Sequence, residues 1–173
     1  MFANRFVSLR PRLATTLLSM ALVACGGGSD GDSSATGTSG GSGDALVGTW
    51  TTNVSQIMAD NPAIFSSINA TCNGPVVLTF RSNGSFEQNL EAGCSFPEGR
   101  SGSATIRASG NWTATATQIT VTNAVNSGVI TVDGVSRPLT FIGNGTANYS
   151  ISGNRLTLQP AVSGGTVQNY TRS

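Results

Sequence analysis

VVLTFRSNGSFEQNLEA, residues 76–92, contains two runs in which apolar and polar residues alternate, joined by Ser-Asn-Gly. A three-residue loop with Gly84 in the left-handed conformation joins two antiparallel strands and pairs Phe80 with Phe86. In this register the apolar side chains fall on one face and nearly all the polar ones on the other. A slip of one residue would destroy that separation. The stretch therefore predicts a β-hairpin with one buried face.

Two cysteines flank this hairpin. The same register, continued outward along both strands, places Cys72 opposite Cys94. Directly opposed residues of antiparallel strands lie close enough for their side chains to interact. We therefore predict a disulfide that closes the open end of the hairpin. Pro75 interrupts the ladder of hydrogen bonds nearby, so the bridge joins either paired strands or loops.

Two later segments, 111–122 and 148–159, align with each other without a gap. Each contains a strand, a tight turn and a second strand. In the later segment a Gly-Asn turn at 153–154 pairs Ile151 with Leu156. Apolar residues alternate with Thr and Ser in both segments, which predicts antiparallel strands buried on one face.

The same alternation recurs through most of the chain after residue 45. The expected strands are 46–54, 76–81, 85–92, 103–115, 118–123, 128–133, 138–143, 147–152, 155–159 and 166–172. Eight to ten short strands in sequence order predict an all-β, up-and-down antiparallel barrel, with a β-sandwich as the alternative. Four small inward residues in 103–115 indicate either a sharply bent strand or space inside the barrel.

One segment departs from the β pattern. It lies within 55–75, where QIMADNPAIFSSI occupies residues 56–68. We expect Asn61 to cap a short helix that begins at Pro62, because asparagine is favoured before a helix and proline at its first position.

The beginning of the chain has the pattern of an export signal. Three arginines precede an apolar run that is too short to span a bilayer and ends in LVAC, residues 22–25. LVAC resembles the lipobox of bacterial lipoproteins. The resemblance implies removal of residues 1–24, diacylglyceryl on the sulfur of Cys25 and acylation of the new amino terminus, which gives stable anchoring. The alternative is a plain secretory signal with a chance cysteine. Gly26 favours the outer membrane, because inner-membrane retention signals of this class often carry aspartate there.

A glycine- and serine-rich segment follows the lipobox. Residues 26–44 hold no large apolar side chain, so we expect 25–44 to be a lipidated, flexible tether. The folded domain is then 45–173. Its acidic and basic residues nearly balance and form no basic cluster, which argues against nucleic acid as a partner.

The composition argues against catalysis. The chain has no histidine, which removes the commonest general base and metal ligand. It also lacks lysine, so it has no Ser-Lys pair and no Schiff base. Glu87 and Glu91 would lie roughly 13 Å apart on one strand, beyond the roughly 5–9.5 Å of a glycosidase pair. We expect no enzyme activity, no metal site and no cofactor.

Three stretches together resemble the bacterial lipocalin-like domain. They are LVGTW at 46–50, which carries G-x-W, LTFRSNGSF at 78–86 and YSISGNRLTL at 149–158. The resemblance covers 45–172 and implies an antiparallel barrel, often with an internal cavity for a small apolar ligand. The chain departs from typical lipocalins in the insertion at 55–75 and in lacking an Asp-bearing motif on the central loop.

Five inward residues are candidate contacts for such a ligand: Trp50, Phe80, Gln88, Trp112 and Tyr149. Gln88 is the one polar residue on the inward face of the 76–92 hairpin. It either orients a ligand or is a buried amide satisfied by the protein, and the second interpretation is favoured. The tryptophans and the tyrosine are more often core residues than ligand contacts.

The first strand raises a separate expectation. Alternation places Gly48 and Trp50 on the inward face, with Gly48 leaving room for the indole. In lipocalins a late arginine packs against this tryptophan. The resemblance makes Arg172 the candidate for such a cation–π contact, and the alternative is a frayed terminus.

The sequence thus predicts a membrane-anchored lipoprotein of the cell envelope, with its barrel in the periplasm or at the cell surface. The expected partners are the membrane, through the lipid at Cys25, and a small apolar ligand. The alternative is a structural or protein-interaction lipoprotein, an inhibitor or an assembly accessory, that binds another envelope protein and no ligand.

Overall fold

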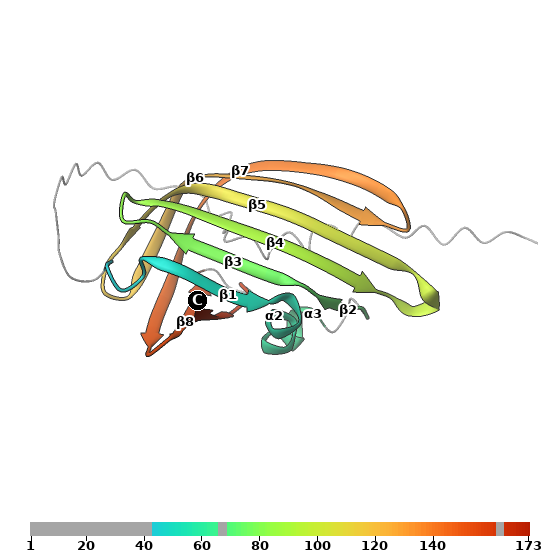
Figure 1. Cartoon of the computed structure of the whole chain (residues 1–173), viewed down its shortest axis with the longest axis horizontal. Coiled ribbons are helices and arrows are strands. Elements are labelled where there is room, and N and C mark those ends of the chain that lie inside the picture. The colour runs from blue at the N-terminus through green and yellow to red at the C-terminus, as the bar shows by residue number, and fades with distance from the viewer. Residues whose placement is uncertain (1–42, 66–68, 162–164) are drawn as a thin grey trace, which may run out of the picture.

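The computed structural model describes residues 43–65, 69–161 and 165–173. The strands are β1 (Gly48–Asn53), β2 (Thr71–Asn73), β3 (Pro75–Phe80), β4 (Ser85–Ser95), β5 (Ser101–Ala114), β6 (Gln118–Val132), β7 (Val135–Ser152), β8 (Arg155–Pro160) and β9 (Gln168–Arg172). The helices are α2 (Val54–Asp60), α3 (Pro62–Phe65) and a 3₁₀ turn at Pro97–Gly99. Figure 1 shows the long strands β4 to β7 arching over the shorter ones.

The sheet closes on itself. Its order is β2-β4-β3-β1-β9-β8-β7-β6-β5, and an additional pairing of β4 with β5 completes the ring. Every pairing is antiparallel, and apart from β2 the strands follow one another around the ring in chain order. The fold is therefore an eight-stranded up-and-down barrel, as predicted, and consistent with a lipocalin-like all-β fold. The β-sandwich alternative is wrong.

The predicted hairpin register is confirmed. Val76 pairs with Leu90 and Phe80 with Phe86, and the inward side chains of both strands are buried. Gly84 adopts φ +80° in the turn, a conformation that glycine takes at little energetic cost. The alternation of side chains and the turn residue together dictate this register.

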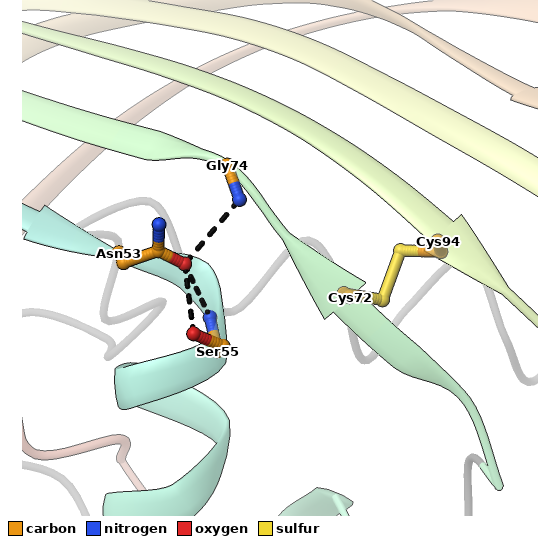
Figure 2. Close-up of a disulfide and its surroundings, with 5 residues drawn as sticks. All are labelled: Asn53, Ser55, Cys72, Gly74 and Cys94. Carbon is orange, nitrogen blue, oxygen red and sulfur yellow. Dashed lines mark hydrogen bonds between the residues drawn. A yellow bond between two sulfur atoms is a disulfide. The ribbon is translucent and has the colours of Figure 1, made fainter.

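The disulfide is also confirmed. Cys72 and Cys94 are register partners on β2 and β4, and their sulfur atoms are bonded (Figure 2). The ladder beside β4 is interrupted at Gly74, between β2 and β3. A side chain there would overlap the carbonyl oxygen of Glu91, and Gly74 has φ +150°. The bridge thus joins paired strands, and only glycine fits the interruption.

Two pairs of expected strands are continuous, so the predicted breaks near 124–127 and 144–146 are wrong. The expected 118–123 and 128–133 both belong to β6, and 138–143 and 147–152 both belong to β7. In place of a turn, β6 carries a β-bulge between Val121 and Ala124. Each bulge adds one residue and reverses the alternation of the strand.

The bulge accounts for glycine in the neighbouring strand. A Cβ atom at Gly110 would lie 2.8 Å from the carbonyl oxygen of Thr122 and 2.9 Å from Cα of Ala124. Asn123 adopts φ +53°, and its amide donates to Oδ1 of Asn144 at 2.8 Å. The absence of a side chain at Gly110 therefore makes room for the bulged backbone of β6.

The helical insertion differs in its boundaries. A helix begins at Pro62 as predicted, but α2 precedes it, with Asn53 as its N-cap and Asn61 as its C-cap. The side chain of Asn61 forms hydrogen bonds with Ile57 and Val167 and none with the described residues of α3, so its predicted capping of the helix at Pro62 is wrong. The Oδ1 atom of Asn53 accepts from the amide of Ser55 at 2.9 Å and from the amide of Gly74 at 3.3 Å (Figure 2). Asn61 ends α2 and exchanges hydrogen bonds with the backbone of Val167. Its amide therefore ties the insertion to the segment before β9.

The chain before the barrel is described only from residue 43. Residues 43–46 form a turn in which the amide of Leu46 donates to the carbonyl of Gly43 at 3.0 Å. The signal segment, Cys25 and all but the last two residues of the expected tether lie outside the described residues. Within the described ranges, no helix has the length and apolar character needed to cross a membrane.

Candidate ligand site in the barrel

Trp50 and Arg172 form the contact that the resemblance implied. Trp50 is fully buried, and its Nε1 donates to the carbonyl of Leu46 at 2.8 Å. The guanidinium of Arg172, its register partner on β9, lies 4.3 Å from the ring centroid. Arg172 also donates from Nη1 to the carbonyl of Val47 at 3.1 Å. The cation–π prediction is confirmed, and the frayed-terminus alternative is wrong.

The space at Gly48 serves a different residue from the one expected. A Cβ atom there would lie 3.0 Å from Nη1 of Arg172. Gly48 therefore leaves room for the guanidinium of Arg172 rather than for the indole of Trp50. This correction explains the G-x-W spacing, because Gly48 and Trp50 both face the same arginine.

Three aromatic side chains fill the end of the barrel beside the 82–84 turn. The rings of Phe80 and Trp112 have centroids 5.1 Å apart in an edge-to-face arrangement, and those of Phe80 and Phe86 lie 6.5 Å apart. The Nε1 atom of Trp112 donates to the carbonyl of Ser85 at 3.0 Å. The structure thus brings two of the predicted ligand contacts together as a packed cluster.

Tyr149 lies apart from that cluster. Its hydroxyl donates to the carbonyl of Thr115 at 2.8 Å, and partial burial raises its pKa. Tyr149 pairs with Leu158 across β7 and β8, in the same register as the predicted pair of Ile151 and Leu156, which is confirmed. Its hydroxyl end is therefore attached to the backbone of the β5–β6 connection.

Gln88 belongs to a buried polar chain that crosses the barrel. Its Nε2 donates to the hydroxyl of Tyr170 at 3.1 Å, and that hydroxyl donates to Oε1 of Gln168. All three residues are at most 3% exposed. Burial raises the pKa of Tyr170, and the hydrogen bond from Gln88 opposes the shift. The Nε2 of Gln88 is thus satisfied by the protein, as the favoured interpretation predicted.

Asn126 is the second buried amide of the interior. It pairs with Ala108, which pairs with Gln88 on its other side, so these three residues form one inward row across β4, β5 and β6. Asn126 is 0% exposed, and neither its Nδ2 nor its Oδ1 has a hydrogen-bond partner among the described residues. A buried amide without partners costs roughly 1–3 kcal/mol per unsatisfied group. Such groups are rare in native proteins and call for a partner such as a water, an ion or a ligand.

Small residues occupy the sheet positions next to Asn126 on β5 and β6. Its neighbours two residues away along β6 are Ala124 and Gly128, and Ala108 lies opposite. Ala124 and Ala108 are buried. The amide thus has two N–H donors and one acceptor oxygen beside apolar side chains, and binding sites for small molecules combine a few polar groups with an apolar lining in this way.

Sequence reasoning missed Asn126, Gln168 and Tyr170. Asn126 fell in the expected break between two strands, because the bulge reverses the alternation before it. Gln168 and Tyr170 occupy alternate positions of the expected strand 166–172, so the alternation of that strand was sufficient to predict that both side chains point into the barrel. Their contact with Gln88 was not, because it joins residues 82 apart in sequence.

The guanidinium of Arg172 lies over Trp50, whereas the ion pairs in the described parts of the chain lie on the outer surface. Arg81 pairs with Glu87 and Arg100 with Asp133 on the surface. The pKa of Glu87 is lowered, chiefly by its hydrogen bond from Arg81. The ranges that the structure covers contain no group of three or more His, Cys, Asp or Glu that would hold a metal ion.

Comparison with known proteins gives no match: no family model, no curated protein and no solved structure matches the chain. The structure alone therefore defines the class, a small eight-stranded antiparallel barrel compatible with a ligand-binding or a structural role.

Proposed function

We propose that this protein is a lipocalin-like lipoprotein of the cell envelope whose barrel binds a small, mainly apolar ligand and catalyses no reaction. The observation that carries the proposal is the buried amide of Asn126, which has no partner among the described residues. A ligand that accepts a hydrogen bond from Nδ2 and donates one to Oδ1 removes the desolvation penalty of both atoms. A hydroxyl group on an apolar body does both.

The surroundings of Asn126 support an apolar ligand body. Ala108 and Ala124 leave more room than larger side chains would, and Ile106 and Ile130 add buried apolar surface on β5 and β6. The aromatic side chains beside the 82–84 turn pack against one another, and Gln88 is already bonded to Tyr170, so Asn126 is the favoured interior amide for a ligand.

The proposed anchor is the lipid on Cys25. The LVAC segment and the glycine- and serine-rich stretch that follows it support this part of the proposal. Cell fractionation tests it: the wild-type chain is expected in the outer-membrane fraction and the Cys25→Ser chain in the soluble periplasmic fraction. Equal membrane association of both chains would contradict the anchor without touching the ligand proposal.

The absence of histidine and lysine from the whole chain supports a non-catalytic role. Binding in the envelope then means carriage, storage or presentation of the ligand. Solvent extraction of protein purified from its own host, followed by mass spectrometry of the extract, tests the ligand. An apolar compound present in proportion to the protein is expected, whereas an extract that matches the buffer blank would contradict the proposal.

A second candidate function rests on the outer face of β6 and β7. Val125 and Ile142 are register partners there and are 45% and 76% exposed, and Val129 on the same face of β6 is 42% exposed. Neighbouring apolar side chains on a protein surface often mark a contact with another protein. Chemical crosslinking in intact cells distinguishes the candidates: a specific envelope partner that is lost in Val125→Thr/Ile142→Thr favours the interaction role.

A further inference from the structure

A recess separate from the barrel interior lies on the outer face of the sheet, where β8, β9 and β1 are neighbours. Its volume is about 610 Å³, and Gln56 of α2 and the β7–β8 turn contribute to its walls. Its lining includes Thr51, Asn53, Ser152, Asn154, Arg155 and Thr171, and no aspartate or glutamate. The recess is thus lined by hydroxyl, amide and guanidinium groups.

Three of these residues form a row across the sheet. Arg155 pairs with Thr171, and Thr171 pairs with Thr51 on the next strand. Directly opposed residues have Cβ atoms about 5 Å apart. The sheet therefore places the Cβ atoms of Arg155, Thr171 and Thr51 in a line, at a spacing that a ligand with several oxygen atoms can span. The Thr51 hydroxyl also donates to the carbonyl of Thr171 at 3.4 Å.

Arg155 supplies the positive charge of the recess, because it is the one charged side chain among the residues that line it. In the portions of the chain that the structure describes, Arg155 has no ion pair and no side-chain hydrogen bond, unlike Arg81 and Arg100. The carboxylate of Asp60, outside the lining, accepts from two lining residues, Gln56 at 2.8 Å and Asn169 at 2.7 Å. The guanidinium of Arg155 is thus open to an anionic group of a ligand.

The amide of Asn53 adds a donor in a fixed position. Its Oδ1 accepts from Ser55 and Gly74, which fixes the amide plane (Figure 2). Its Nδ2 has no partner in the described ranges. The Asn53 amide is thus oriented by the cap of α2 and offers its remaining N–H groups to a ligand.

We infer that this recess binds an anionic, polyhydroxylated ligand, that is, a sugar phosphate or a sugar acid. Arg155 binds the phosphate or carboxylate group, because guanidinium matches the geometry of both. The threonine hydroxyls and the Asn53 amide bind the hydroxyl groups of the sugar. The inference is independent of the ligand proposed for the barrel interior, since no residue of the Asn126 row lines this recess.

Nuclear magnetic resonance titration of the full chain in detergent micelles tests the inference. The probes are glucose 6-phosphate, glucuronate, glucose and inorganic phosphate. One of the two anionic sugars is expected to shift the amide signals of Thr51, Arg155 and Thr171 saturably, and comparison of the two identifies the anionic group. Glucose and inorganic phosphate are expected to bind about tenfold more weakly.

Two variants make the test specific. Arg155→Gln is expected to weaken binding of the anionic sugar about tenfold. Arg107 lies on the outer face of β5 and away from the recess, so Arg107→Gln is expected to change the affinity for the anionic sugar by less than about twofold. Shifts scattered over the barrel, equal binding by Arg155→Gln, or inorganic phosphate binding as tightly as both sugars would each overturn the assignment.

Discussion

Arg172 lies over the indole of Trp50 with its guanidinium carbon 4.3 Å from the ring centroid, and in this way the last strand is fixed to the first. The arginine also donates to the carbonyl groups of Val47 and Ala45, so it holds the segment that enters the barrel. We expect Arg172→Ala to lower the free energy of unfolding by about 1–3 kcal/mol, because a cation–π contact and charged hydrogen bonds are lost together. Urea unfolding of the full chain measures this.

Arg107→Ala is the matched control for that prediction. Arg107 is exposed on β5, and its removal is expected to change stability by no more than about 0.5 kcal/mol. Equal stability losses for both arginines would contradict a specific role of the Arg172–Trp50 contact.

Gly74 separates β2 from β3 beside the disulfide. We expect Gly74→Ala to destabilise the protein by about 2 kcal/mol or more, because its Cβ would overlap the backbone at Glu91 and its φ of +150° disfavours a side chain. Gly93→Ala is the control, since a Cβ there meets nothing within 4 Å. Thermal unfolding compares the two variants. Similar melting temperatures would contradict the claim that only glycine fits between β2 and β3.

The disulfide between Cys72 and Cys94 closes the open end of the hairpin formed by β3 and β4. Its cysteines are 22 residues apart, so loss of the bridge in Cys72→Ala/Cys94→Ala is expected to cost about 3 kcal/mol through the freedom gained by the unfolded chain. Unfolding by denaturant, in the absence of a reducing agent, measures the change in the free energy of unfolding. A double variant as stable as the wild type would show that the bridge adds no constraint beyond the pairing of β2 with β4.

Tyr170 makes stability depend on alkaline pH. Burial raises its pKa in the folded protein, whereas a tyrosine in the unfolded chain ionises near pH 10. Above about pH 10 the folded state therefore binds more protons than the unfolded state, so the free energy of unfolding falls by about 1.4 kcal/mol per pH unit. Its contribution is fully present below that pH.

Urea unfolding between pH 8 and 11.5 checks the alkaline prediction. The chain has two tyrosines and no lysine or histidine, so few other groups titrate in this range. Tyr170→Phe is expected to lose most of the slope, whereas Tyr149→Phe keeps most of it, because the pKa of Tyr149 is raised only by partial burial. A slope that persists in Tyr170→Phe would assign the effect to another group.

Local patterns predicted the hairpins because everything that fixes them lies within a few residues. The register of 76–92 follows from one glycine turn and the alternation on either side, and the structure has that register. Closure of the barrel was predicted from the number and order of strands. The G-x-W resemblance located Trp50 and its arginine correctly.

The interior polar groups were less predictable. The bulge after Val121 shifts the inward positions of β6 by one residue. The alternation of apolar and polar residues is therefore broken at the bulge, and the sequence there has the pattern of a strand end. Asn126 thus looked like part of a loop. Likewise, the surroundings of Arg155 could not be predicted from its own strand, because the residues that line the recess come mainly from β1, β8 and β9.

The central claim is that Asn126 orients a ligand inside the barrel. Native mass spectrometry of the full chain and of Asn126→Leu, both purified from the host envelope under identical conditions, tests it most directly. Without ligand the leucine variant is expected to be the more stable by roughly 1–3 kcal/mol, since it lacks the unpaired amide, which shows that it folds. The account predicts a bound small molecule on the wild type and a bound fraction reduced about tenfold in the variant. A wild type without bound mass, or equal occupancy of both proteins, would contradict it.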